Sequence, residues 1–200
     1  AWALGVELMT HCRMPAHPAV VTAAAFSLVF MFALAASLVV RLWLAGRQIA
    51  HVRRHREQVP VAFVERISLA AHAKAADYTV AKQHHAMLHA LVDALLLVAL
   101  TLGGGLGAIV AWTELLPVSP LWRDVAMFGL AGLVYAAVGL PFSWWHTFRL
   151  EERFGFNRMT LGLWLADLAK GLAVAVVLGL PLLVLVLWLM RAAGAPWWLW

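Results

Sequence analysis

Charged residues are scarce in this 200-residue sequence. They make up 12% of it, whereas soluble domains average about 25%. Hydrophobic residues make up 64%. So few charges cannot keep the surface of a folded domain in water, and the composition therefore excludes an ordinary soluble protein. It predicts a protein whose main solvent is the lipid bilayer.

Cysteine is nearly absent too, and the only one, Cys12, excludes an intrachain disulfide. The first residues, A-W-A-L-G-V-E-L-M-T-H-C-R, lack the basic segment, apolar run and small-residue site of a cleavable signal peptide. No basic stripe with interleaved aromatic side chains is present, which argues against nucleic acid as a partner. The formal net charge of +5 has a simpler cause, because the basic residues lie in loops beside apolar runs.

Four apolar runs of roughly 20 residues, enough for a helix to cross a bilayer, organise the sequence. They predict an all-α fold: a polytopic transmembrane helix bundle that forms a single domain over residues 1–200. The predicted spans are 19–40, 88–112, 125–145 and 171–190. The segment P-W-W-L-W at 196–200 is typical of a membrane interface and predicts the start of a fifth span.

Lysine and arginine are distributed unevenly around these spans. The loop over 45–87 holds seven of them and the loop over 147–170 holds four, but the opposite side holds only three. Both rich loops fall on one side if all four spans cross, so the positive-inside rule predicts an external N-terminus and two cytoplasmic loops. In the first loop, apolar residues at helical spacing predict a helix over 61–75, followed by a turn over 77–79.

Three features in or near the second span have more than one interpretation. His85 and His89 have the spacing of a zinc-binding pair but lack the glutamate of H-E-x-x-H, and interfacial histidines need no metal. Asp93 either belongs to an intramembrane polar site, such as a proton relay or cavity lining, or reaches interfacial water. The cluster G-G-G-L-G at 103–107 favours close helix packing, and its apolar surroundings exclude a phosphate-binding loop.

A charged segment, H-T-F-R-L-E-E-R-F-G-F-N-R-M-T followed by D-L-A-K, lies between the third and fourth spans. Such charge at a membrane edge is costly and often marks a water-filled functional site. Glu151 and Glu152 have the chemistry of an acid–base pair, although adjacent helical residues point about 100° apart. Pairing with Arg149 or Arg153 is the structural alternative.

The rest of this segment predicts an ordered turn. Gly155 permits a tight bend, and the Asn157 side chain can accept a hydrogen bond from the backbone just after it. Thr160 is placed to cap the following helix. Asp167 and Lys170, three residues apart on that helix, are placed to pair.

The string E-E-R-F-G-F-N-R-M-T, with D-L-A-K after it, resembles the CAAX prenyl protease 1 family of integral-membrane zinc metalloproteases. The strings R-I-S and H-A-K-A-A-D-Y-T-V-A-K before it, and L-G-L-P-L-L after it, resemble the same family in the same order. The resemblance covers residues 47–200. It implies seven membrane helices around a water-filled chamber, with zinc held by two histidines of an H-E-x-x-H helix and a later glutamate.

No H-E-x-x-H occurs in residues 1–200, so this chain is expected to contain neither a catalytic residue nor a zinc ligand. The resemblance implies an N-terminal membrane domain, inactive alone, of a zinc metalloendopeptidase that cleaves prenylated or membrane-associated proteins or peptides. The residues it assigns to bracing the active site or lining the substrate chamber are Glu151, Glu152, Asn157, Thr160 and Asp167.

The partners this implies are the protein's own C-terminal catalytic region, a peptide or membrane-protein substrate, and the lipid bilayer. The implied location is a bacterial inner membrane, or the endoplasmic reticulum membrane in a eukaryote. Asp93, the prolines within the spans and the glycine cluster keep a second hypothesis open. In that hypothesis the chain is a non-enzymatic membrane scaffold or a transporter-like bundle.

Overall fold

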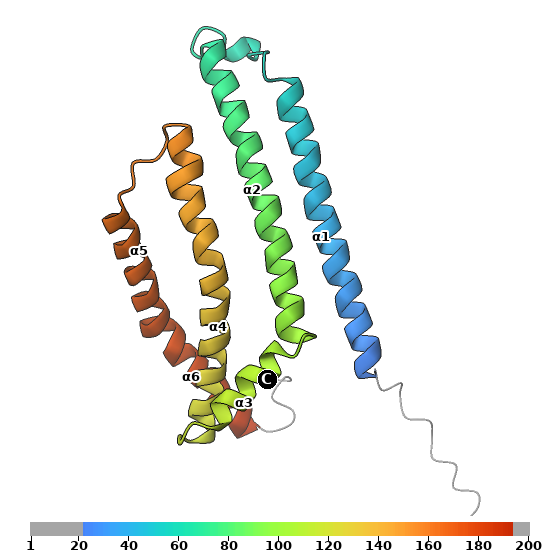
Figure 1. The fold of residues 1–200 in the computed structure, drawn as a ribbon, viewed down its shortest axis with the longest axis vertical. Coiled ribbons are helices and arrows are strands. Elements are labelled where there is room, and N and C mark those ends of the chain that lie inside the picture. The colour runs from blue at the N-terminus through green and yellow to red at the C-terminus, as the bar shows by residue number, and fades with distance from the viewer. Residues whose placement is uncertain (1–21, 194–200) are drawn as a thin grey trace, which may run out of the picture. The chain divides into compact units, whose positions relative to one another are not determined.

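The computed structural model describes residues 22–193, and all of their regular structure is helical (Figure 1). One 3-10 turn, Val61–Phe63, precedes the second long helix. Two π-helical turns, His146–Glu151 and Ala175–Gly179, continue the helices before them. The all-α prediction is therefore confirmed. The α-helices are α1 (Ala23–Arg54), α2 (Leu69–Thr101), α3 (Gly105–Glu114), α4 (Pro120–Trp145), α5 (Leu161–Val174) and α6 (Leu180–Ala193).

Four continuous helical stretches are long and apolar enough to cross a bilayer, in agreement with the four predicted spans. They are Ala23–Arg54, Leu69–Thr101, Pro120–Glu151 and Leu161–Ala193. A helix of 32 or 33 residues is about 50 Å long, against about 30 Å of hydrocarbon. Each helix therefore extends into regions predicted as loops. The predicted start of a fifth span, 196–200, lies outside the described residues.

The chain divides into two units within α1, after Ser37. In the first unit, α1 begins with a cap, because the Thr22 hydroxyl oxygen accepts a hydrogen bond from the backbone nitrogen of Ala25 at 3.2 Å. Its apolar side chains, such as Phe26 and Phe32, are exposed. This is the surface expected of a helix in lipid. The second unit contains the other helices and the candidate site.

The start of α2 differs from the prediction: the helix over 61–75 and the turn over 77–79 are wrong. Pro60 begins only the single 3-10 turn. α2 starts after Ser68, whose hydroxyl oxygen accepts a hydrogen bond from the backbone nitrogen of Ala71 at 3.2 Å. No proline or glycine follows within the helix, so it continues unbroken through the predicted turn.

The predicted span over 88–112 is not one continuous helix, because it is interrupted at its glycine cluster. Gly104 has φ of +79° and separates α2 from α3. A Cβ at Gly103 would lie 2.6 Å from the carbonyl oxygen of Ala99, whereas one at Gly107 would meet nothing within 4 Å. Gly103 and Gly105 therefore allow a close approach to the backbone of α2, whereas no described helix packs on Gly107. Close helix packing through this cluster stays a prediction, and Gly104 lets the chain bend between α2 and α3.

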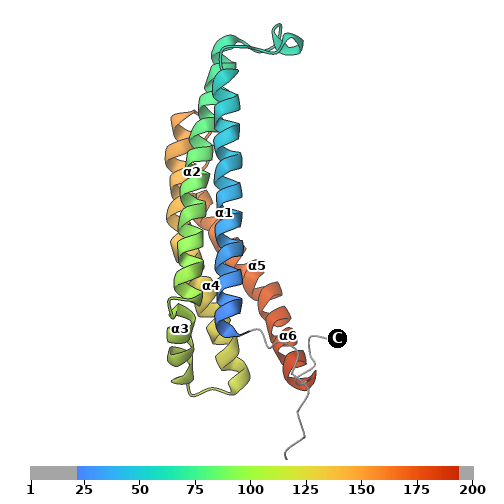
Figure 2. The same ribbon diagram turned by 90° about the vertical axis from the view of Figure 1, so that its right-hand side faces the viewer.

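Packing in the second unit is sparse. α4 contacts α2, α3 and α6. α5 stands apart from α4 (Figures 1 and 2). An ion pair between Asp124 and Arg191 joins the start of α4 to the end of α6. No large side chain is fully buried in the described part of the chain, so lipid or further protein must cover its apolar surface.

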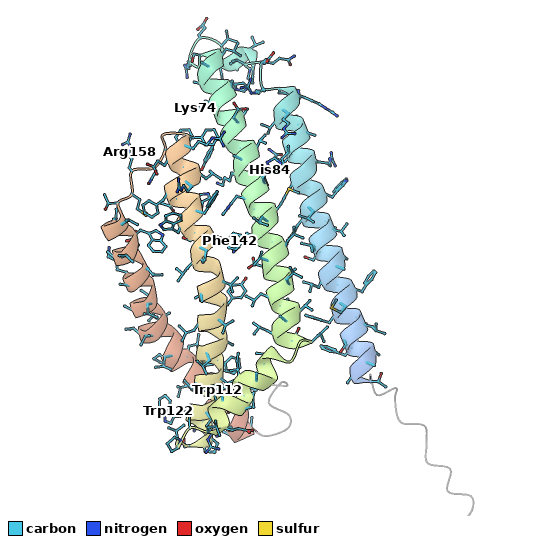
Figure 3. The ribbon with its side chains drawn as sticks, viewed as in Figure 1. Lys74, His84, Trp112, Trp122, Phe142 and Arg158 are labelled. Carbon is cyan, nitrogen blue, oxygen red and sulfur yellow. The ribbon has the colours of Figure 1, made fainter. Side chains whose placement is uncertain are left out.

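The two ends of these helices carry different residues. Trp112 and Trp122 lie at one end, whereas Lys74 and Arg158 lie at the other (Figure 3). Tryptophan is enriched at both membrane interfaces, and lysine and arginine are enriched on the cytoplasmic side. The arrangement agrees with the cytoplasmic placement predicted for the basic loops, which remains a prediction.

Cysteine labelling tests that orientation. In a Cys12→Ser background, Gln58→Cys and Arg158→Cys are expected to resist a membrane-impermeant thiol reagent added to intact cells and to react after lysis. Ser119→Cys, at the exposed start of α4, is the matched site expected to react from outside. External labelling at positions 58 and 158 with protection at 119 would mean that the orientation is reversed.

Candidate functional site

The charged segment between α4 and α5 forms a turn that its own backbone closes. The carbonyl oxygen of Glu151 accepts hydrogen bonds from the backbone nitrogens of Phe156 (2.9 Å) and Asn157 (3.3 Å). Gly155 has φ of +69°, a conformation that side chains with a Cβ disfavour. The tight turn predicted from F-G-F-N is therefore confirmed.

Two side chains direct the exit from this turn into α5, as predicted. The Asn157 side-chain oxygen accepts a hydrogen bond from the backbone nitrogen of Met159 at 2.7 Å. The Thr160 hydroxyl oxygen accepts one from the backbone nitrogen of Leu163 at 3.3 Å, which caps the helix. Both bonds span two or three residues, so the turn and the start of α5 form one local unit.

An aromatic cluster holds the turn against α2. The Tyr78 ring lies edge-on to Phe154 and Phe156, with centroid separations of 5.4 and 4.9 Å. The Lys74 ammonium lies 5.3 Å from the Phe156 centroid, within the range of a cation–π contact. Neither Tyr78 nor Lys74 is among the site residues predicted from the sequence. The signal was their spacing of four, which places both side chains on one face of α2.

Glu151 forms an ion pair with neither Arg149 nor Arg153, the structural alternative considered from the sequence. Its carboxylate lies 3.6 Å from Nδ1 of His146, and both side chains are half-buried. The reason is the π-helical turn His146–Glu151, which brings residues five apart onto one face. An α-helix would have placed His146 and Glu151 on different faces.

The other predicted site residues of this segment are exposed. Glu152 lies at the surface beside the turn. Asp167 pairs with Lys170 at 3.4 Å on the exposed side of α5, as predicted. The structure therefore unites Glu151, Asn157 and Thr160 in one turn, whereas Asp167 lies farther along α5. A functional role for any of them remains a prediction.

His85, His89 and Asp93 lie one turn apart along α2. The His85 ring is 5.7 Å from the rings of Phe142 and His146, and the His89 ring is 4.6 Å from that of Phe142. The Asp93 carboxylate is 3.6 Å from Nε2 of His89, just beyond hydrogen-bond length. α2 therefore turns the rings of His85 and His89 toward Phe142 of α4.

Residues 22–193 contain no group of three His, Cys, Asp or Glu side chains placed to hold a metal ion. The described residues thus do not fit a zinc site, and His85 and His89 have aromatic and acidic neighbours instead. The arrangement can order a loop and place polar groups between helices.

A bidentate ion pair links the segment after α1 to α2. Nε and one terminal nitrogen of Arg56 donate to the two carboxylate oxygens of Asp77, both at 2.8 Å. This hydrogen bonding and the charge of Asp77 raise the pKa of the Arg56 guanidinium. Both side chains are partly exposed, so the pair sets geometry more than stability.

Comparison with known proteins assigns a family to this architecture. The sequence model of a family described as CAAX prenyl protease N-terminal, five membrane helices, matches residues 48–200. CAAX prenyl protease 1 of Saccharomyces cerevisiae is 40% identical over 70 residues, covering 35% of this chain and 16% of that protein. The Caenorhabditis elegans homolog is 26% identical over 171 residues, covering 84% of this chain and 38% of that protein.

The same fold occurs in a solved structure. The crystal structure of S. mikatae Ste24p superimposes with a TM-score of 0.72 at 24% identity and covers 82% of this chain and 39% of that chain. At this identity the likeness concerns the fold alone. The chain spans well under two thirds of the length of each of these relatives.

Proposed function

The chain belongs to the CAAX prenyl protease family as its N-terminal membrane domain, and we propose that it forms a chamber wall of an integral-membrane zinc metalloendopeptidase. The substrates would be prenylated or membrane-associated proteins or peptides. The location would be a bacterial inner membrane, or the endoplasmic reticulum membrane in a eukaryote.

The chamber proposal is supported mainly by one observation: α2 directs polar side chains toward α4. His85 and His89 lie against Phe142 of α4, His85 also lies near His146, and Asp93 lies 3.6 Å from His89. Ionisable residues within membrane spans usually face a bundle interior or a water-filled cavity, because lipid solvates them poorly. A polar wall inside an apolar bundle suits a hydrolase, which must admit water and a peptide.

The zinc site and the catalytic residues would belong to a C-terminal catalytic region, the first partner we propose for this chain. The family resemblance implies zinc, which would supply an activated water, while the described residues provide no ligand set. The turn holding Glu151, Asn157 and Thr160 would act on that region by bracing it or by bordering the substrate path.

The full-length protein and the chain 1–200 should be compared on a farnesylated peptide with a C-terminal CAAX sequence. Cleavage is expected from the full-length protein only, together with bound zinc that His85→Ala leaves in place. Zinc held by the chain 1–200 and lost in His85→Ala would contradict the proposal. A full-length protein that lacks H-E-x-x-H and does not cleave the peptide would favour the scaffold or transporter-like alternative.

A further inference from the structure

Two adjoining grooves run along α2 beside the end of α4. The first has a volume of about 670 Å³ and the second about 360 Å³. They share the lining residues Ala81, His84, Arg153 and Phe154. Along the helix axis, His84 lies between the levels of Lys74 and Phe142 (Figure 3). Leu88, where the second membrane span is predicted to begin, lines the first groove. The grooves therefore lie at the predicted edge of the membrane.

The linings of these two grooves are strongly basic. Four arginines contribute to them: Arg53, Arg56, Arg149 and Arg153. Asp77 is the one acidic residue among their lining residues, and both of its carboxylate oxygens already accept hydrogen bonds from Arg56. Within residues 22–193, Arg53, Arg149 and Arg153 form no salt bridge. The grooves thus present unneutralised positive charge.

The first groove becomes apolar toward the predicted membrane interior. It continues into a third groove of about 270 Å³, with which it shares His85, Leu88 and Trp145. The remaining lining of that third groove is Pro141 and Phe142. A ligand that fills both grooves must therefore combine an anionic end near Arg149 and Arg153 with an apolar end along α4.

We propose that this continuous groove binds an anionic phospholipid, with its phosphodiester at Arg149 and Arg153 and an acyl chain along Leu88, Phe142 and Trp145. A guanidinium can donate two parallel hydrogen bonds to a phosphate, which makes arginine well suited to this headgroup. Basic pockets between membrane helices at the cytoplasmic face are typical sites for anionic lipids. His85 and Phe142 belong both to this groove and to the chamber wall proposed above. Lipid binding is measured without peptidase activity, so the two proposals can fail separately.

The apolar continuation distinguishes a lipid from other anions. An acidic peptide or free phosphate would satisfy the arginines but would leave Leu88, Phe142 and Trp145 unfilled. A ligand with both a charged headgroup and a hydrocarbon chain matches the change of lining along the groove. A farnesylated peptide shares these two features, so displacement of the phospholipid by the farnesylated peptide would assign the groove to substrate instead. We therefore expect both arginines and chain length to matter for binding.

Native mass spectrometry of the delipidated full-length protein, given equal amounts of dioleoyl phosphatidylglycerol and phosphatidylcholine, tests this site. The wild type is expected to retain about 10-fold more phosphatidylglycerol than phosphatidylcholine. A ratio of this size corresponds to the free energy of about one charge-assisted hydrogen bond. Arg149→Gln with Arg153→Gln should bring the ratio close to one. The matched control, Arg54→Gln with Arg66→Gln, removes the same charge from residues that line neither groove and should keep the preference.

Further arms separate the alternative ligands. Soluble glycerophosphate, an acidic peptide and dihexanoyl phosphatidylglycerol should each fail to displace the long-chain lipid at equal concentration. If the double variant does not fold, Arg153→Lys replaces it and should lose part of the preference, because an ammonium lacks the planar fork. An unchanged lipid ratio in the groove variants, an equal loss in the control, or displacement by a soluble anion would each overturn the proposal.

Discussion

Asn157→Ala is expected to lower the peptidase activity of the full-length protein by up to about 100-fold, whereas Arg158→Ala should have little effect. The Asn157 side-chain oxygen holds the backbone nitrogen of Met159 at 2.7 Å. Losing such a bond costs about 1 kcal/mol of local stability, and a shift of about 1 Å at an active site can cost about 100-fold in rate. Arg158 is exposed.

Cleavage of a fluorogenic peptide at matched expression in detergent measures this difference. Asn157→Asp is the informative control, because it keeps the accepting oxygen and should retain most of the activity that Asn157→Ala loses. Equal rates for Asn157→Ala and Arg158→Ala would mean that the F-G-F-N turn only connects two helices. The proposed role of this turn in supporting the active site would then be wrong.

Gly155→Val is expected to destabilise the same turn by about 2 kcal/mol, roughly a 30-fold change in the local equilibrium. Space is not the obstacle, since a Cβ at Gly155 would meet only the end of the Lys74 side chain, at an ordinary 3.6 Å. The obstacle is the backbone, because φ of +69° brings a Cβ close to the following carbonyl and a β-branched residue suffers most.

Thermal unfolding and peptidase activity of the purified variants measure this effect. Gly155→Asn should be close to wild type, because asparagine tolerates the left-handed conformation. The matched control is Gly162→Ala in α5, where an added Cβ meets nothing within 4 Å and helix propensity favours alanine. Equal stability of Gly155→Val and Gly162→Ala would show that the turn does not depend on this conformation in the folded protein.

Features that depend on neighbouring residues could be predicted from the sequence. Apolar runs of sufficient length specify membrane helices because the bilayer requires the backbone to satisfy its own hydrogen bonds. The Asn157 bond and the Thr160 cap involve residues at most three apart, and the turn at Gly155 is closed by residues at most six apart. Their geometry is local chemistry, so the sequence pattern was sufficient to predict it. The start of α2 after Ser68 is also a local feature, but the apolar spacing over 61–75 predicted a helix that begins too early.

Features that join distant parts of the chain, or that depend on unusual helix winding, needed the tertiary structure. Tyr78 meets Phe154 and Phe156 across more than seventy residues of sequence. His146 and Glu151 are only five residues apart, but they meet through a π turn that α-helical spacing does not anticipate. The amphipathic groove likewise forms only when α2 and the end of α4 lie side by side.

The sequence by itself therefore determined the membrane character, the helical class and the closed turn before α5, because each rests on composition or on contacts within a few residues. The tertiary structure alone decided which polar groups α2 turns toward α4, what holds the turn against α2, and where basic and apolar linings meet. These depend on the helix pairing and on the local winding of α4, and neither follows from residue order along one segment.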